Sequence, residues 1–99
     1  MVIWSVPARN DLKKIHDYIA NDSKYYAQNV IQEIVAKTET LTELPEIGRI
    51  VPEISDQNIR ELIVYSYRLI YEISEFGVEI LAIIHVRRDF KSAWDERDH

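Results

Sequence analysis

Cationic and titratable side chains interrupt two apolar, strand-like segments in the second half of the chain. Arg68 lies inside one segment, and His85, Arg87 and Arg88 lie at the end of the other. Guanidinium groups bind phosphate through forked hydrogen bonds, and a histidine exchanges a proton near neutral pH. Side chains alternate along a strand, so His85 and Arg87 are expected on one face and Arg88 on the other. If Arg68 shares the face of His85, these residues form a basic phosphate site; the hairpin register that decides this is left open.

Each of these side chains also has a structural interpretation. An arginine in a central strand needs an acidic partner, which Glu61 or Glu53 can supply. A histidine at the end of a strand is commonly a hydrogen-bonded structural residue, so His85 is open to both interpretations. The other charged candidates for a functional surface are Arg49, Glu53, Arg60 and Arg88. Their structural interpretation is that they are solvated charges or members of ion pairs.

The composition is that of a single globular domain covering residues 1–99, with 46% hydrophobic and 29% charged residues. The lack of cysteine excludes disulfides, thiol catalysis and a cysteine-based zinc site, and the three histidines are too scattered for another metal site. Two glycines are too few for a glycine-rich phosphate loop. We therefore expect no cofactor and no metal. Neither a membrane-spanning run nor a signal-peptide pattern is present, which predicts a cytoplasmic protein without membrane contact.

The charge of the chain is acidic and unevenly distributed. The net charge is −5, and residues 43–56 alone carry −3. Proteins that bind nucleic acid on their own are usually basic, because neutralising phosphates supplies most of their affinity. The charge therefore argues against direct DNA binding by this chain, and any nucleic-acid contact has to come from a local basic cluster.

Apolar periodicity predicts two helices after a short strand at residues 2–5. The first helix begins at Pro7, whose missing N–H is harmless in a first turn. Its buried face is predicted to contain Ala8, Leu12, Ile15 and Ile19. The second helix follows cap residues 21–23 and ends before Pro45. Its buried stripe is predicted to contain Ala27, Val30, Ile31, Ile34, Leu41 and Leu44.

Three strands follow a loop at residues 45–58, which is rich in turn formers. The strands are predicted at 59–65, 67–74 and 78–86, with Gly77 available for the second turn. Short links between consecutive strands favour an antiparallel meander. The predicted fold class is α+β in the order β-α-α-β-β-β, with an antiparallel helical hairpin packed on a small, mostly antiparallel sheet.

The predicted last strand is apolar on both faces over residues 79–84, although one helix pair covers only one face of a sheet. Two alternatives could cover the second face. The tail after Arg88 could fold back as a short helix through Phe90, Ala93 and Trp94, or a partner chain could occupy the surface.

The motifs, taken together, resemble one known superfamily. They are Gly48-Arg49 with Pro52-Glu53, then Arg60-Glu61-Leu62, then Tyr67-Arg68-Leu69-Ile70-Tyr71, and finally Ile84-His85 with Arg87-Arg88. In this order and spacing the chain resembles the RelE/ParE superfamily, the toxin halves of prokaryotic type II toxin–antitoxin systems, over residues 1–89. The sequences of these motifs are closer to those of the ParE branch than to those of the RelE branch. The resemblance implies a protein that inhibits growth and takes part in plasmid stabilisation.

The resemblance implies two alternative activities. ParE-type toxins poison DNA gyrase by binding it, whereas RelE-type toxins are ribosome-dependent, metal-independent mRNA endoribonucleases. In the second case Arg68, His85 and Arg87 would be catalytic, with Glu53 as the base that some members use. The chain lacks the tyrosine or His-Tyr pair of many ribonuclease members and a loop lysine cluster, and its acidity disfavours docking on ribosomal RNA. These departures favour gyrase over the ribosome as the target.

Both branches imply a cognate antitoxin, which would also supply any DNA binding. Amphipathic helices and an under-covered sheet offer surfaces to such a partner. We expect it to lie across the helical hairpin and to reach the sheet face that carries Arg68. The expected antitoxin contacts are Leu12, Ile19, Ile34 and Leu41.

Overall fold

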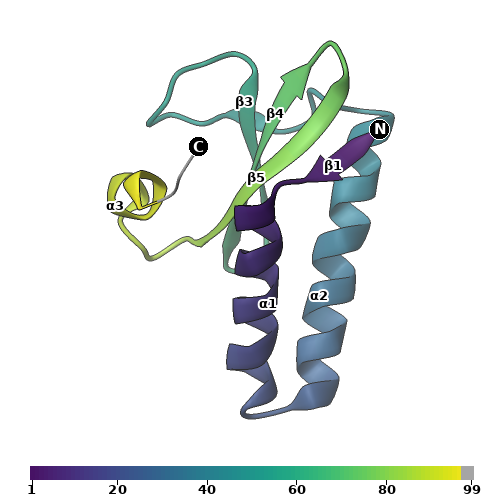
Figure 1. Cartoon of the computed structure of the whole chain (residues 1–99), viewed down its shortest axis with the longest axis vertical. Coiled ribbons are helices and arrows are strands. Elements are labelled where there is room, and N and C mark those ends of the chain that lie inside the picture. The colour runs from purple at the N-terminus through teal and green to yellow at the C-terminus, as the bar shows by residue number, and fades with distance from the viewer. Residues whose placement is uncertain (97–99) are drawn as a thin grey trace.

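The chain folds into a five-stranded sheet with helices packed on it (Figure 1). The structure is a computed structural model, and it describes residues 1–96. The strand order is β1-β5-β4-β3-β2. The strands are β1 (Val2–Trp4), β2 (Arg49–Ile50), β3 (Ile59–Val64), β4 (Tyr67–Ser74) and β5 (Gly77–His85). Only β1 and β5 pair in parallel, and the other neighbours are antiparallel. The predicted α+β class is therefore confirmed.

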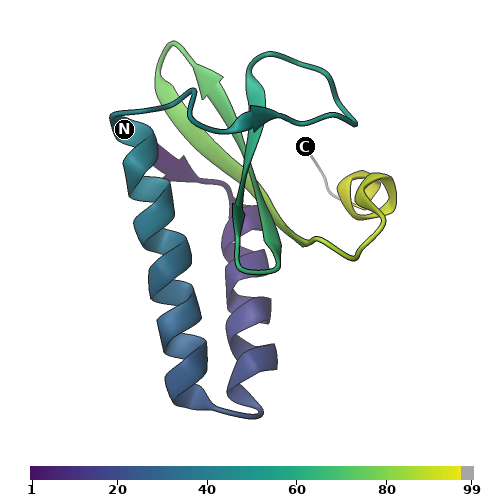
Figure 2. The same ribbon diagram turned by 180° about the vertical axis from the view of Figure 1, so that it is seen from behind.

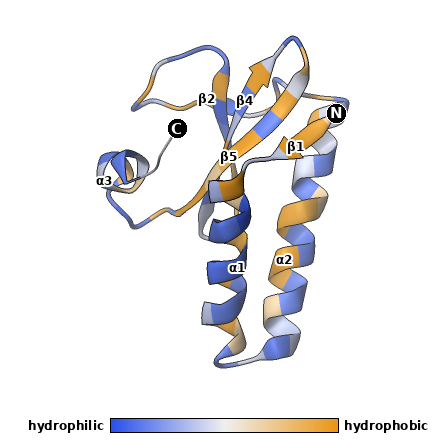
Figure 3. Ribbon diagram, in the orientation of Figure 1, coloured by the Kyte–Doolittle hydropathy of each residue, from blue (hydrophilic) through white to orange (hydrophobic). Residues whose placement is uncertain are grey.

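The helical hairpin consists of α1 (Val6–Ala20) and α2 (Lys24–Glu39), followed by a 3-10 turn, η1 (Thr40–Thr42). Hydroxyl caps begin both helices, because Ser5 accepts the N–H of Ala8 and Ser23 accepts that of Tyr26. The hairpin projects well beyond the sheet in both views (Figures 1 and 2). The side of α1 that faces the viewer in Figure 3 is largely hydrophilic, whereas β1 is hydrophobic. This pattern agrees with helices that pack on the sheet through one apolar stripe.

The loop predicted between the helices and the meander contains a short strand, which is a correction to the sequence analysis. β2 pairs with β3 through Arg49 opposite Glu61 and Ile50 opposite Arg60. The sheet consequently has one strand more than predicted. A two-residue edge strand is stabilised by its partner strand rather than by its own sequence, so local residue preferences do not reveal it.

Two apolar clusters lie on the two faces of the sheet. On the hairpin side, Ile34 and Leu41 pack against Leu69, Tyr71 and Ile83. On the other side, the short helix α3 (Phe90–Asp95) follows its cap residue Asp89. The cluster that it covers contains Val51, Ile70, Ala82, Ile84, Phe90 and Ala93. Of the two alternatives for covering the second sheet face, the structure shows the first, in which the chain's own tail folds back over it.

Among the described residues, no helix is long and apolar enough to cross a membrane.

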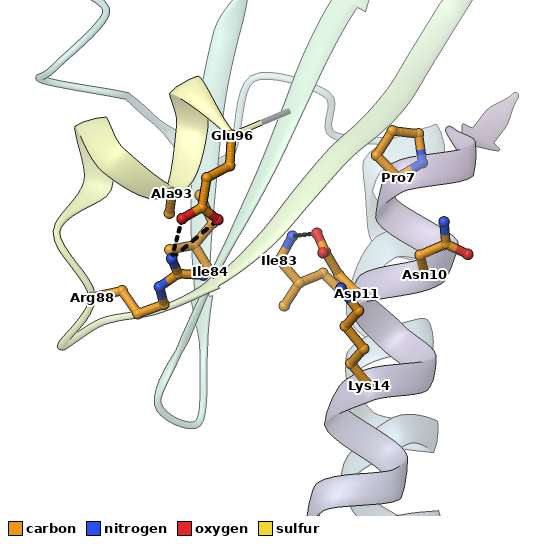
Figure 4. Close-up of a pocket in the computed structure, with 9 residues that line it drawn as sticks. All are labelled: Pro7, Asn10, Asp11, Lys14, Ile83, Ile84, Arg88, Ala93 and Glu96. Carbon is orange, nitrogen blue, oxygen red and sulfur yellow. Dashed lines mark hydrogen bonds and ion pairs between the residues drawn. The ribbon is translucent and has the colours of Figure 1, made fainter. Parts of the chain in front are cut away.

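The end of β5 lies beyond the reach of β1, and side chains cap it. β1 pairs only as far as Ile80, and further along β5 the N–H of Ile83 donates to Asp11 Oδ2 of α1 at 2.9 Å. Ser5 Oγ donates to the carbonyl of Leu81 at 3.4 Å. Figure 4 shows Asp11 at Ile83 in a hollow of about 300 Å³ between α1 and α3. Side chains from the start of the chain and from α1 therefore bind two backbone groups of β5 that β1 does not reach.

Candidate functional site

Arg68 of β4 lies at the centre of an ion-pair network on the α3 side of the sheet. Its Nη1 and Nη2 donate to the two carboxylate oxygens of Glu53 at 2.9 and 2.7 Å, and its Nε donates to Glu61 Oε1 at 2.6 Å. The ring of Phe90 covers the guanidinium with its centroid 4.4 Å from Cζ. The Arg68 side chain is only 11% exposed. Both acidic partners that the sequence offered are thus used at once.

Glu61 of β3 joins two arginines. Its side chain is fully buried, and Oε2 accepts a hydrogen bond from Nε of Arg49, the residue opposite it on β2. The Arg49 side chain is 65% exposed, so the network ends at the surface there. A buried carboxylate is tolerated when its oxygens are paired in this way. Among residues 1–96, no buried side-chain nitrogen or oxygen lacks a hydrogen bond.

The ion pair between Arg68 and Glu53 sets the protonation state of both groups. The hydrogen bond from Arg68 is the main cause that lowers the pKa of Glu53, against a smaller opposing effect of burial. The hydrogen bond to Glu53 likewise raises the pKa of Arg68, with a further contribution from Glu61. At neutral pH, Glu53 is therefore a carboxylate that is already engaged and is a poor proton acceptor.

His85 lies on the opposite face of the sheet from Arg68. In the β4–β5 register His85 aligns with Tyr67, and Arg68 aligns with Ile84. The His85 ring packs edge-on against Tyr67 with centroids 5.4 Å apart, and its Nδ1 accepts the backbone N–H of Arg87 at 3.0 Å. The register thus answers the question that the sequence left open, because Arg68 and His85 do not share a face of the sheet.

A register shift in β5 causes this separation. Ile70 aligns with Ala82, but the next residue of β4, Tyr71, aligns with Ile80, so the strands slip by one residue at Leu81. A one-residue slip turns every following side chain to the other face. The slip therefore moves His85 from the face of Arg68 to the face of the helical hairpin.

The remaining candidates have separate structural contacts. Arg60 donates from Nε to the carbonyl of Gln57 at 3.0 Å and from Nη1 to that of Gly48 at 3.1 Å, which ties down the 45–58 segment. Arg88 pairs with Glu96 on the α3 side of the hollow in Figure 4, with Nη2 3.1 and 3.2 Å from the two carboxylate oxygens. Arg87 lies beyond the end of β5 and is exposed. The alternation rule used for it therefore does not apply.

Two of the four expected antitoxin contacts lie in the chain's own core. Ile34 is fully buried and Leu41 is 1% exposed, since both fill the space between the hairpin and the sheet. Leu12 and Ile19 are half-buried at the margin of that core and remain accessible. The hairpin and Arg68 also lie on opposite sheet faces, so a partner that contacts both has to pass around an edge.

A loop site that the sequence analysis did not select lies between η1 and β2. Tyr71 Oη donates to the carbonyl of Pro45 at 2.7 Å and accepts the N–H of Gly48 at 2.9 Å. Leu44, expected in the buried stripe of the second helix, is instead 55% exposed, as is Ile47. The acidic charge of residues 43–56 was the available sequence signal, but charge alone does not reveal an apolar surface.

The described residues contain no group of three or more His, Asp or Glu side chains placed to hold a metal ion. The site consists instead of paired charges, aromatic contacts and an exposed loop. A helical hairpin packed on a small mixed sheet is the fold class that the resemblance to the RelE/ParE superfamily implied.

Comparison with known proteins identifies the family within this class. The chain belongs to the family described as "ParE toxin of type II toxin-antitoxin system, parDE", whose model matches residues 2–90. It is 33% identical over 88 residues to Toxin RelE2 of Caulobacter vibrioides, covering 88% of this chain and 96% of that protein. A solved chain of the chromosomal ParDE TA system from P. aeruginosa shares the fold, with a TM-score of 0.71 and 22% identity over 85% of this chain and 92% of that one. The protein is therefore the toxin of a type II toxin–antitoxin system.

Proposed function

We propose that this toxin inhibits growth by binding and poisoning DNA gyrase in the cytoplasm and that a cognate antitoxin neutralises it. The observation that carries the proposal is the engagement of Arg68 by Glu53 and Glu61. A toxin that acts by binding another protein needs no free acid–base pair, so this network is compatible with that activity as it stands.

The same network is poorly suited to RNA cleavage. Attack of a ribose 2′-hydroxyl on the adjacent phosphate needs a proton acceptor and cationic groups that face the phosphate. All three nitrogens of the Arg68 guanidinium already donate to carboxylates, and Phe90 covers its face. Two carboxylates beside a phosphate would also repel it.

The candidate base and the candidate acid are separated as well. Glu53 has a lowered pKa, which weakens it as a base. His85 lies on the other side of the sheet and cannot share a substrate with Arg68 without rearrangement of β5. Ribonuclease activity would therefore require the network to open first.

Ribosome-dependent mRNA cleavage is the second candidate function, and one finding favours it. The curated relative from Caulobacter vibrioides carries the name RelE2. His85 and the exposed Arg87 are the residues that such an activity would use without disturbing Arg68.

A direct comparison of the two targets tests the proposal. The purified toxin is added to a supercoiling assay with gyrase and relaxed plasmid, and separately to a translating extract in which mRNA ends are mapped. We expect loss of supercoiling, accumulation of cleaved DNA complexes and intact mRNA. Codon-specific mRNA cuts with unaffected gyrase would overturn the proposal in favour of the ribonuclease. The variant His85→Gln with Arg87→Ala should abolish activity only in that second case.

A further inference from the structure

An apolar groove with acidic residues at its rim lies at the end of the sheet farthest from His85. The connection from α2 to β2 crosses the β4–β5 hairpin there (Figure 2). The groove has a volume of about 470 Å³. It is lined by Glu43, Leu44, Pro45, Glu46, Ile47 and Ile73. We call this set the loop groove. A smaller hollow of about 100 Å³ adjoins it at Pro45 and Ile73.

The loop groove exposes apolar side chains that contribute little to the fold. Leu44 and Ile47 are each 55% exposed, and neither belongs to the apolar clusters on the two sheet faces. Apolar area left in water carries a free-energy cost of about 25 cal/mol per Å² relative to burial. Adjacent exposed side chains of this kind, rimmed by charge, are typical of a surface that binds a protein.

The loop that carries these side chains is held in one conformation. The Tyr71 hydroxyl joins Pro45 to Gly48, and Arg60 donates to the Gly48 carbonyl. A Cβ at Gly48 would lie 2.6 Å from the Tyr71 hydroxyl oxygen and from the Glu61 carbonyl oxygen, so only glycine fits. A surface fixed before binding loses less conformational entropy on association.

The charges around the loop groove specify the kind of partner. Glu43 and Glu46 are exposed and make no ion pair with any residue of the described 1–96 range. The segment 43–56 carries a net charge of −3 and the whole chain −5. A complementary partner presents lysine or arginine next to an apolar side chain. Enzymes that bind DNA present basic surfaces of this kind, because they neutralise phosphates.

We propose that the loop groove is the surface through which the toxin binds gyrase. An apolar side chain of gyrase fills the space between Leu44 and Ile47, and basic residues from its DNA-binding surface pair with Glu43 and Glu46. This inference rests on gyrase being the target. It accounts for the acidic charge of the toxin, since complementary charges speed association and favour one docking orientation.

Charge reversal at the groove tests the inference. The variant Glu43→Lys with Glu46→Lys is compared with Asp22→Lys with Glu33→Lys, which changes net charge equally at exposed positions of the hairpin. The apolar part is tested separately with Leu44→Ser and Ile47→Ser. Circular dichroism and thermal melting establish that each variant is folded. Gyrase affinity is measured by surface plasmon resonance at several salt concentrations, together with inhibition of supercoiling.

We expect both groove variants to bind gyrase at least about tenfold more weakly, while the hairpin control matches the wild type within about twofold. Wild-type affinity should fall with salt, and the charge-reversed variant should lose most of that dependence. Groove variants that inhibit gyrase as well as the wild type would overturn the inference and leave the proposed function standing.

Two further outcomes assign the groove to another occupant and also overturn the inference. One is normal gyrase inhibition with loss of neutralisation by the antitoxin, which would place the antitoxin there. The other is normal gyrase inhibition with a change in sedimentation from dimer to monomer, which would place a second toxin copy there. A wild-type toxin that does not bind gyrase would overturn both the inference and the proposed function.

Discussion

Arg68 and Glu53 form a two-point ion pair in which both terminal nitrogens of the guanidinium donate to both oxygens of the carboxylate. The pair joins the central strand β4 to the loop after β2. The same arginine holds the buried Glu61 through Nε. A residue that sequence alone marks as a candidate phosphate ligand is therefore, in the folded chain, the organising centre of an internal network.

The two carboxylates of this network should differ strongly in their contribution to stability. Glu61→Gln leaves Arg68 and Arg49 beside a buried neutral amide, and we expect a loss of about 3 kcal/mol in the free energy of unfolding. Glu53→Gln should cost about 1 kcal/mol, because the Glu53 side chain is 41% exposed and solvent screens the pair. Urea denaturation at pH 7 measures both values. Equal losses for the two variants would contradict the network as described.

The lowered pKa of Glu53 predicts a pH dependence of stability. Its folded-state pKa lies below the ordinary value of 4.5, so its stabilising effect is complete above that pH. The effect is lost as pH falls from 4.5 through the lower folded-state value. Denaturation between pH 7 and pH 3 should therefore show a shallower acid decline for Glu53→Gln than for the wild type. Parallel curves for the two proteins would argue against the ion pair.

The hydroxyl of Tyr71 should stabilise the loop groove. Tyr71→Phe removes the acceptor of the Gly48 N–H and the donor to the Pro45 carbonyl in a buried position, and we expect a loss of about 2 kcal/mol. If the groove binds gyrase, the same change should weaken gyrase inhibition at a temperature where the variant is still folded. Tyr25→Phe is the matched control, since Tyr25 is 77% exposed and should lose neither property.

Asp11 should stabilise the open edge of β5. Asp11→Ala removes the acceptor of the Ile83 N–H, with an expected loss of about 1–2 kcal/mol. Asp11→Asn keeps an acceptor oxygen and should recover part of it. Hydrogen exchange of the Ile83 amide, followed by NMR, reports the effect at the bond itself. Unchanged protection of that amide in Asp11→Ala would contradict the capping role.

The sequence by itself determined the two long helices, the three-stranded meander and the possible partners of the buried arginine. The spacing of Ala8, Leu12 and Ile15 indicated the first helix, and Phe90 with Ala93 and Trp94 offered a short C-terminal helix as one of two alternatives for covering the second sheet face. Both are local patterns in which one apolar face recurs with helical spacing. Glu53 and Glu61 could be named as partners of Arg68 because an arginine in a central strand requires a carboxylate.

The tertiary structure alone decided which side chains meet. The slip at Leu81 places His85 on the face opposite Arg68, and a register shift of one residue leaves no reliable trace in composition or periodicity. The 3-10 turn at Thr40–Thr42 interrupts the α-helical spacing of α2. Leu44 is therefore not on the buried face of that helix and is exposed in the loop groove. Local propensity indicates where the longer strands and helices form, whereas their alignment, and a short edge strand such as β2, depend on contacts between residues far apart in the chain.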